Sequence, residues 1–313
     1  MLKETIAKLK KLYESKKVRS ITFYVIIAIY SVFALSPFAE PFFKSCFNAL
    51  GLNDHRYTSY FYDYSITGFE TENSDCYLIK AYDKHVLMDT SDHEYVKDLV
   101  VKLKAAKSPY IDAIFISHFD SDHSGGLSTI LKEVDVGKIY IPSFYDEENR
   151  NVKNFFRIIE YFAADYETVG VGDSINIGNL KFECLAPISN RSSSNNNSLV
   201  LMMTAGKVKT LFCGDMEQGE MKDLLKSGCS LDCDILKVSH HGSINGINEE
   251  FITKASPEYA LISAGWNSYG LPNSATLKLL DSMNAKVLRT DKQGEIYLAF
   301  NNDSKDIYTH TTK

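Results

Sequence analysis

The sequence predicts an α/β protein built from two β-sheets, each covered by helices on its outer face. Strand-like and helix-like segments alternate after residue 60, and the alternation occurs in both halves of the chain. The 313 residues are 44% hydrophobic, which is enough to bury the core of one large domain or two small ones. Charged residues make up 24% of the chain, so its composition is not that of a disordered protein.

The first 39 residues differ in composition from the rest of the chain. Residues 1–19 contain seven basic and two acidic side chains, a net charge of +5. Residues 20–39 contain no charged side chain, and a helix of that length spans roughly 30 Å, the hydrocarbon thickness of a bilayer. We therefore expect a basic cytoplasmic segment at 1–19, a transmembrane helix at 20–39 and a connector at 40–60. A secretory signal peptide and a buried helix are the alternatives.

The charge distribution predicts the orientation of this anchor. The basic flank precedes the apolar segment, so the N-terminus should stay in the cytoplasm and the domain at 61–313 should face outward. The whole chain carries −6, and removing the +5 of the first segment leaves −11 on residues 20–313. An acidic body of this kind has no general attraction for nucleic acid phosphates.

In the first half of the predicted domain, three strands precede the first helix. We expect these strands at 64–69, 76–82 and 85–90. An amphipathic helix follows at 92–106, where apolar residues recur at helical spacing after an acidic start. The rest of this half is predicted as a strand at 112–117, a helix at 125–134, a strand at 138–142 and a helix at 151–164.

The second half contains the same kinds of segment. We expect a hairpin at 174–187, two strands within 197–215 and a helix at 217–228 that ends at a glycine. The remaining elements are predicted as a strand ending in a histidine pair at 233–243, a strand at 259–265, a helix at 274–283 and strands at 285–290 and 295–300.

Four candidate metal ligands fall within six residues, directly after the strand predicted at 112–117. The motif ISHFDSDHSGG contains His118, Asp120, Asp122 and His123. Imidazole and carboxylate groups bind zinc, manganese and iron, and two of each can serve two ions if the loop turns back on itself. The six cysteines include no C-x-x-C pair, so we do not expect a cysteine zinc site.

Two later strands also end in polar residues. One leads to Asp215, and the other leads to the pair His240 and His241. A rigid sheet holds side chains at its strand ends in fixed positions, as a metal site requires, and a carboxylate such as Asp215 can bridge two ions. Each motif alone is typical of a turn or a surface cap. The three together, in this order, indicate a metal site.

The motifs LMDT, SHFDSDHSGG, NSLVL, LFCGD and LKVSHHGS, in this order, resemble those of the metallo-β-lactamase superfamily. In particular they resemble the hydrolase domain of ComEC, the bacterial DNA-uptake channel protein, and its stand-alone relatives. The resemblance covers residues 61–300 and includes SPEYALISAG, YGLP and AKVLRTDKQGEIYL near the C-terminus. It implies an αββα sandwich with the site at one edge of the two sheets.

The resemblance also implies roles for individual residues, and two divalent ions, zinc or manganese. The implied metal ligands are His118 and Asp120 for one ion, Asp122 and His123 for the other, Asp215 as the bridge and His241 as a late histidine ligand. Asp122 would also orient the attacking hydroxide, and His240 would stabilise charge or protonate the leaving oxygen. Asp89 would support the site from behind, and Asn197 and Ser243 would contact substrate.

The chain departs from the superfamily pattern at several positions. Asp120 stands where a histidine is common, although the ComEC-like group shares this aspartate, and the change favours manganese or magnesium. No histidine precedes Ser198, where the wider superfamily has another ligand. FETENSDCYLI replaces the group's D-x-G-Q-G-D strand, and Leu271 replaces the histidine of its YGHP motif. These differences leave the substrate and the level of activity open.

We therefore expect a membrane-anchored, metal-dependent hydrolase that attacks a phosphodiester with a metal-bound hydroxide. Its substrate would be DNA or a cell-envelope polymer outside the cytoplasmic membrane, and the sequence identifies no particular protein partner. One alternative is an ester or lactam hydrolase of the same fold. The other is a binding module whose catalytic activity is weakened or lost.

Overall fold

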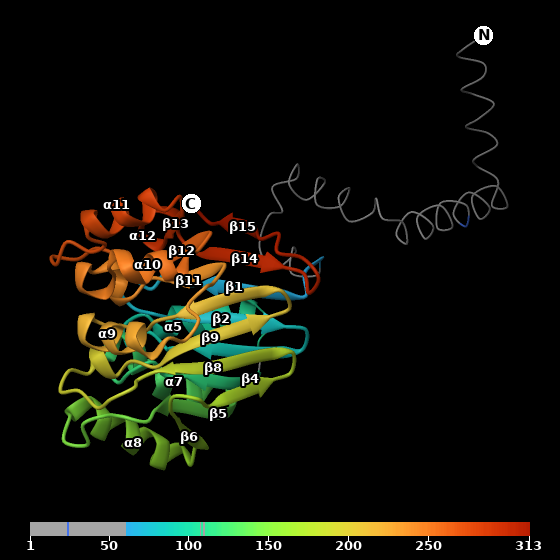
Figure 1. Cartoon of the computed structure of the whole chain (residues 1–313). Coiled ribbons are helices and arrows are strands. Elements are labelled where there is room, and N and C mark those ends of the chain that lie inside the picture. Colours follow the sequence, from blue (N-terminus) through green and yellow to red (C-terminus); the bar gives the residue numbers. More distant parts are fainter. Residues whose placement is uncertain (1–23, 25–60, 107, 109) are drawn as a thin grey trace, which may run out of the picture. The chain divides into compact units, whose positions relative to one another are not determined.

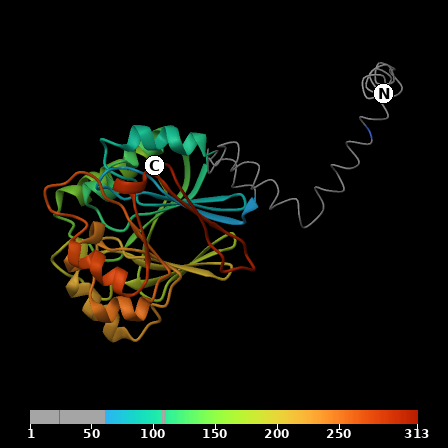
Figure 2. The ribbon, with the colours of Figure 1, turned by 90° about the horizontal axis from the view of Figure 1, so that it is seen from above.

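The described chain forms two β-sheets that lie face to face. The computed structural model describes Tyr24 and residues 61–106, 108 and 110–313. Figure 1 shows the arrangement of the elements, and Figure 2 shows helices on the outside of each sheet. The prediction of an α/β sandwich with helices on both outer faces is therefore confirmed.

The first sheet combines antiparallel and parallel strands. Its strand order is β15 (Tyr308–Thr311), β14 (Ile296–Phe300), β1 (Tyr64–Gly68), β2 (Tyr77–Ala81), β3 (Lys84–Met88), β4 (Tyr110–Phe115), β5 (Asp135–Pro142) and β6 (Tyr166–Val169). The strands from β3 to β6 pair in parallel, and the others pair antiparallel. The segments that follow β3 and β4 therefore leave the sheet at the same edge.

The second sheet has the same mixed character. Its strand order is β13 (Lys286–Arg289), β12 (Tyr259–Ile262), β11 (Ile235–Lys237), β10 (Val208–Phe212), β9 (Val200–Ala205), β8 (Leu180–Ala186) and β7 (Ser174–Ile177). The strands from β10 to β13 are parallel, so the segments after β10, β11 and β12 also share one edge.

Three apolar layers hold the sandwich together. The central layer lies between the sheets, where the rings of Phe115 on β4 and Phe182 on β8 have centroids 4.6 Å apart. The outer layers bury one face of each helix against a sheet. The first sheet is covered by α5 (Val96–Ala105), α7 (Leu127–Glu133) and α8 (Arg150–Phe162), and the second by α9 (Gln218–Ser227), α10 (Glu249–Ala255) and α11 (Ser274–Ser282).

Several elements differ from the sequence prediction. The helix expected from residue 92 begins at Val96, because residues 92–95 form a turn in which Asp92 accepts a hydrogen bond from the backbone N–H of Glu94. The sequence analysis missed β6, β15, α10 and the short helices α6 (Ser121–Ser124) and α12 (Thr290–Gln293).

The predicted segments at 1–19, 20–39 and 40–60 lie outside the described residues, apart from Tyr24. Within the part of the chain that the structure describes, no helix has both the length and the apolarity needed to cross a bilayer. The transmembrane helix at 20–39 therefore stays a prediction.

Candidate metal centre

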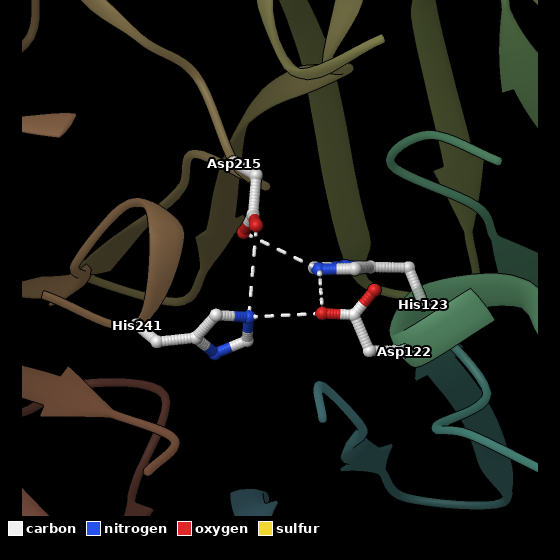
Figure 3. A group of neighbouring side chains, drawn as sticks. All are labelled: Asp122, His123, Asp215 and His241. Atoms are coloured by element: carbon white, nitrogen blue, oxygen red, sulfur yellow. Dashed lines mark hydrogen bonds and ion pairs between the residues drawn. The ribbon is translucent and has the colours of Figure 1, made fainter. Parts of the chain in front are cut away.

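Three chain segments bring two histidines and two aspartates together at the edge of the two sheets. Asp122 and His123 lie in α6, just after β4 of the first sheet. Asp215 follows β10, and His241 lies in the turn η3 (His240–Gly242) after β11, both in the second sheet. Figure 3 shows the four side chains pointing toward one another. One ligand atom from each of them lies within 4.8 Å of all the others.

The distances in this group suit a shared cation. His123 Nε2 lies 3.7 Å from Asp122 Oδ2 and 3.3 Å from Asp215 Oδ1. His241 Nε2 lies 3.3 Å from Asp122 Oδ2 and 3.6 Å from Asp215 Oδ2. Each histidine nitrogen therefore faces both carboxylates, and a single ion between them would contact four ligands of the types that zinc and manganese accept.

The backbone around His241 is held in an unusual conformation. His240, His241 and Gly242 all have positive φ angles, of 50°, 51° and 79°. Only glycine adopts this region without a steric cost, and two consecutive non-glycine residues there are typical of a functional turn. A Cβ atom on Gly242 would lie 2.5 Å from Pro272 Cβ. The close approach of this turn to Pro272 therefore requires a glycine.

The electrostatics of the group favour positive charge at its centre. Burial alone would raise the pKa of the Asp122 and Asp215 carboxyl groups, but His123 and His241 lower the pKa of both. Burial would lower the pKa of the two imidazoles, and the same carboxylates raise it instead. Four buried or partly buried groups thus stabilise a cation, whether protons on the imidazoles or a metal ion.

Several buried atoms of the group have an unused capacity for ligands. Within the described part of the chain, His123 Nε2, Asp215 Oδ1 and the nearby His118 Nε2 are buried and make no hydrogen bond. Buried polar atoms in folded proteins are nearly always paired. Unpaired nitrogen and oxygen atoms of these types fit the donor set of a divalent ion.

Behind His123, a buried carboxylate fixes the imidazole. Asp89 Oδ2 lies 2.9 Å from His123 Nδ1. Asp89 also accepts hydrogen bonds from the backbone N–H and the hydroxyl of Ser117, at 2.7 and 2.8 Å. This is the position expected of an aspartate that supports the site, because a bonded Nδ1 leaves Nε2 directed at the metal position.

The other predicted pair, His118 and Asp120, lies beside this group but outside it. His118 Nε2 is 3.6 Å from Asp120 Oδ2, and the rings of His118 and His123 have centroids 4.1 Å apart. The neighbouring His118 imidazole is the main cause of the lowered pKa of Asp120. A second ion bound by His118 and Asp120 stays a prediction, whereas the group that contains His123 is formed in the structure.

His240 lies at the rim of the site. Its side chain is 25% exposed, whereas that of His241 is 4% exposed. His240 Nε2 lies 3.8 Å from Asp215 Oδ2, and Nδ1 lies 3.4 Å from Glu217 Oε1. An accessible imidazole at this position can exchange a proton with a bound molecule and with solvent.

The two residues predicted to contact substrate form bonds to the local backbone. Asn197 accepts from the N–H of Arg191 at 2.8 Å and donates to its carbonyl at 2.7 Å, which closes the polar loop before β9. Asn197 and His118 line the same cavity. The Ser243 hydroxyl accepts from the N–H of Asn245 at 3.2 Å and caps the next turn. Substrate contact by either side chain stays a prediction.

Three residues next to the site were missed in the sequence analysis. Asp75 and Lys237 form a buried salt bridge beneath the ligands, and Asn195 Nδ2 lies 3.5 Å from His240 Nδ1. The signal for Lys237 was present in the sequence, because a single lysine interrupts the apolar strand DILKV. Lysine is rarely buried unless it is paired, so its position in a central strand indicated a partner.

Comparison with known proteins agrees with this fold. A model of the metallo-beta-lactamase superfamily matches residues 70–266, which is more than half of the chain. Among solved structures, YhfI from Bacillus subtilis, a metallo-beta-lactamase fold protein, superimposes with a TM-score of 0.51 and 12% identity, over 79% of this chain and 99% of YhfI. CmlA, a diiron β-hydroxylase from Streptomyces venezuelae, gives 0.53 and 12%, over 75% of this chain and 54% of CmlA. At these identities the structures show the fold alone.

The curated relatives include competence proteins. The chain is 35% identical over 208 residues to ComE operon protein 3 of Bacillus subtilis (strain 168), an alignment that covers 66% of this chain and 27% of that protein. It is 30% identical over 224 residues to the competence protein ComA of Neisseria gonorrhoeae, covering 70% and 30%. The chain thus spans less than a third of the length of either relative. The resemblance expected from the motifs is confirmed, and the chain belongs to the metallo-β-lactamase superfamily.

Proposed function

We propose that this protein is a metal-dependent hydrolase that cleaves a phosphodiester, with two divalent ions, zinc or manganese, bound at adjacent positions. The observation that carries the proposal is the convergence of Asp122, His123, Asp215 and His241 within 4.8 Å. His118 and Asp120 would hold the second ion. Ions held there would make a bound water molecule more acidic and stabilise charge on the attacking and leaving oxygens.

The exposure of the side chains indicates where a substrate would enter. His123, Asp215 and His241 are at most 4% exposed, whereas Asp122 and Asp120 are 35% and 39% exposed. The open side of the site is therefore the side that carries Asp122 and Asp120. There, Asp122 would orient the attacking water by accepting one of its hydrogen bonds.

His240 is placed to act on the leaving group. It is partly exposed and lies beside Asp215, so it faces the same opening from the second sheet. Its protonated form would stabilise negative charge on the phosphoryl oxygens or give a proton to the leaving oxygen. Asp122 beside the first sheet would then act on the attacking water, and His240 beside the second sheet would act on the leaving group.

The likeness to competence proteins and to ComEC-like hydrolase domains supports a phosphodiester substrate, such as DNA or a cell-envelope polymer. The donor set supports it as well, because three of its six proposed ligands are the carboxylates of Asp120, Asp122 and Asp215. Hard oxygen ligands suit ions that also bind phosphoryl oxygens.

Assays of the full-length chain test the proposal. The protein is stripped with a chelator, reloaded with zinc or manganese, and supplied with bis(p-nitrophenyl) phosphate, p-nitrophenyl acetate or a β-lactam in parallel. We expect only the phosphodiester to be cleaved, and only by the loaded protein. Cleavage of the ester or the lactam alone would favour another hydrolase of the same fold. A folded protein that binds no ion and cleaves nothing would favour a binding module.

We also propose that residues 20–39 anchor the protein in the cytoplasmic membrane, with the hydrolase domain outside. The uncharged segment and its basic flank support this orientation. Protease added to intact cells stripped of their wall should digest the domain and leave a small N-terminal fragment in the membrane. If the domain is cut only after the cells are lysed, it lies in the cytoplasm and the proposed orientation is wrong.

A further inference from the structure

Lys237 is a buried cation directly beneath the candidate metal ligands. It lies on β11 of the second sheet, is 2% exposed and forms a salt bridge with Asp75, which is 1% exposed. Its Nζ donates to the carbonyl of Gly214 at 2.9 Å and lies 3.6 Å from Asp215 Oδ1. Burial would lower the pKa of Lys237, but Asp75 and Asp215 raise it, so this lysine stays charged. A buried ion pair of this kind is costly and calls for a reason beyond stability.

Asp75 makes the contacts to the remaining ligands. It lies in the segment before β2 of the first sheet, and its backbone N–H donates to the carbonyl of Asp122 at 3.0 Å. Its Oδ2 lies 3.7 Å from His123 Nδ1, and its Oδ1 lies 3.7 Å from His241 Nδ1. Together, Asp75 and Lys237 are close to all four residues of the group.

The pair also joins the two halves of the site. Asp75, Asp122 and His123 come from the first sheet, whereas Lys237, Asp215 and His241 come from the second. The ligands can meet one ion only if the sheet edges keep their spacing at this point. A salt bridge across that gap, between Asp75 just before β2 and Lys237 on β11, fixes the spacing.

We propose that Asp75 and Lys237 are a positioning pair that holds the ligands of the two sheets in metal-binding geometry. The inference rests on the proposed metal site and extends it to two residues that are not themselves ligands. Partners behind the ligands of metal sites commonly change metal affinity by about 10–100-fold. We expect the same range here, because the pair fixes ligands from both sheets.

The test is the double variant D75N/K237M. It removes one negative and one positive charge, so the net charge around the ion does not change, and both replacements are close in size to the originals. We expect cobalt(II) and zinc to bind about 10–100-fold more weakly in a chelator competition. The visible spectrum of bound cobalt(II) should also change, which a loss of stability alone would not cause.

A matched control is the variant D112N/K84M. Lys84 Nζ and Asp112 Oδ1 lie 2.9 Å apart between β3 and β4, at the start of β3 and away from the ligands. The control should keep the wild-type metal affinity and cobalt(II) spectrum. If D75N/K237M also keeps both, the positioning role is overturned. Wild-type protein that binds no ion would overturn both the metal site and this inference.

If the double variant does not fold, K237M alone decides. This change adds one net negative charge beside Asp215, and charge alone would then make cations bind more tightly. A positioning role predicts the opposite sign, with weaker binding and an altered cobalt(II) spectrum. Binding as tight as that of the wild type, or tighter, with an unchanged spectrum would overturn the proposal.

Discussion

The imidazole of His123 is held from behind by Asp89, with 2.9 Å between His123 Nδ1 and Asp89 Oδ2. The same carboxylate accepts two hydrogen bonds from Ser117. An ionised carboxylate can only accept a hydrogen bond, so the proton of His123 sits at Nδ1. The lone pair of Nε2 is then free to bind a metal ion. The tautomer of a metal ligand is thus set by a residue that lies outside the metal position.

We predict that D89N weakens metal binding about 10–100-fold. The backbone N–H of Ser117 requires the amide oxygen of the new side chain, so the amide NH2 would face His123 Nδ1 and favour the wrong tautomer. Asparagine tolerates the positive φ angle of 61° at this position, so the fold should be kept. Chelator competition with zinc measures the effect.

The control for D89N is D112N, because Asp112 is also a largely buried carboxylate that accepts a backbone hydrogen bond, from His85 at 2.9 Å. It should bind metal as tightly as the wild type. Equal affinities for D89N and the wild type would show that Asp89 does not set the tautomer.

We predict that H241A abolishes stable metal binding and lowers hydrolysis at least about 100-fold. His241 supplies one of two imidazoles in the group, and its loss leaves two carboxylates with one nitrogen ligand. Metal content after gel filtration and the rate of phosphodiester cleavage are the measurements. H85A is the control, because His85 lies at the opposite end of β3 from the ligands. Full metal content in H241A would remove this histidine from the ligand set.

The order of strands and motifs made much of this site predictable. Asp122, His123, Asp215 and His241 each come shortly after an apolar run, and parallel strands end at a common edge. Sequence spacing could predict that these residues meet for this reason. It could not show where a side chain points, so the backbone bonds made by Asn197 and Ser243 were not foreseen.

The missed features have physical causes as well. The strands β6 and β15 are four residues long and lie at sheet edges, where most of their residues are exposed or half-buried. They lack the apolar alternation that marks a strand. The salt bridge between Asp75 and Lys237 joins distant parts of the chain across two sheets, and pairing at that range has no local pattern.

We predict that H240A lowers the turnover number at least about 100-fold but keeps the metal content. His240 lies at the rim, 3.8 Å from Asp215, and is not part of the four-residue group. In H240A the turnover number should therefore fall while the metal content stays at the wild-type level, whereas both should fall in H241A. The control is E217Q. Glutamine has the same shape as Glu217, the neighbour of His240 Nδ1, and this change leaves His240 itself in place. A parallel loss of metal in H240A would make His240 a ligand instead of an acid.

We predict that E220Q makes the protein more stable near neutral pH. Glu220 in α9 is 1% exposed, and burial raises its pKa well above the ordinary 4.5. The unfolded chain loses this proton near pH 4.5 and the folded protein keeps it, so stability declines as the pH rises toward the folded-state pKa. The neutral variant lacks this decline. Its free energy of unfolding, measured with urea, should therefore exceed that of the wild type by a margin that grows by about 1.4 kcal/mol per pH unit between pH 4.5 and the folded-state pKa. The exposed Glu249 gives the control, E249Q. An advantage that stays constant between pH 5 and pH 7 would mean that Glu220 ionises normally.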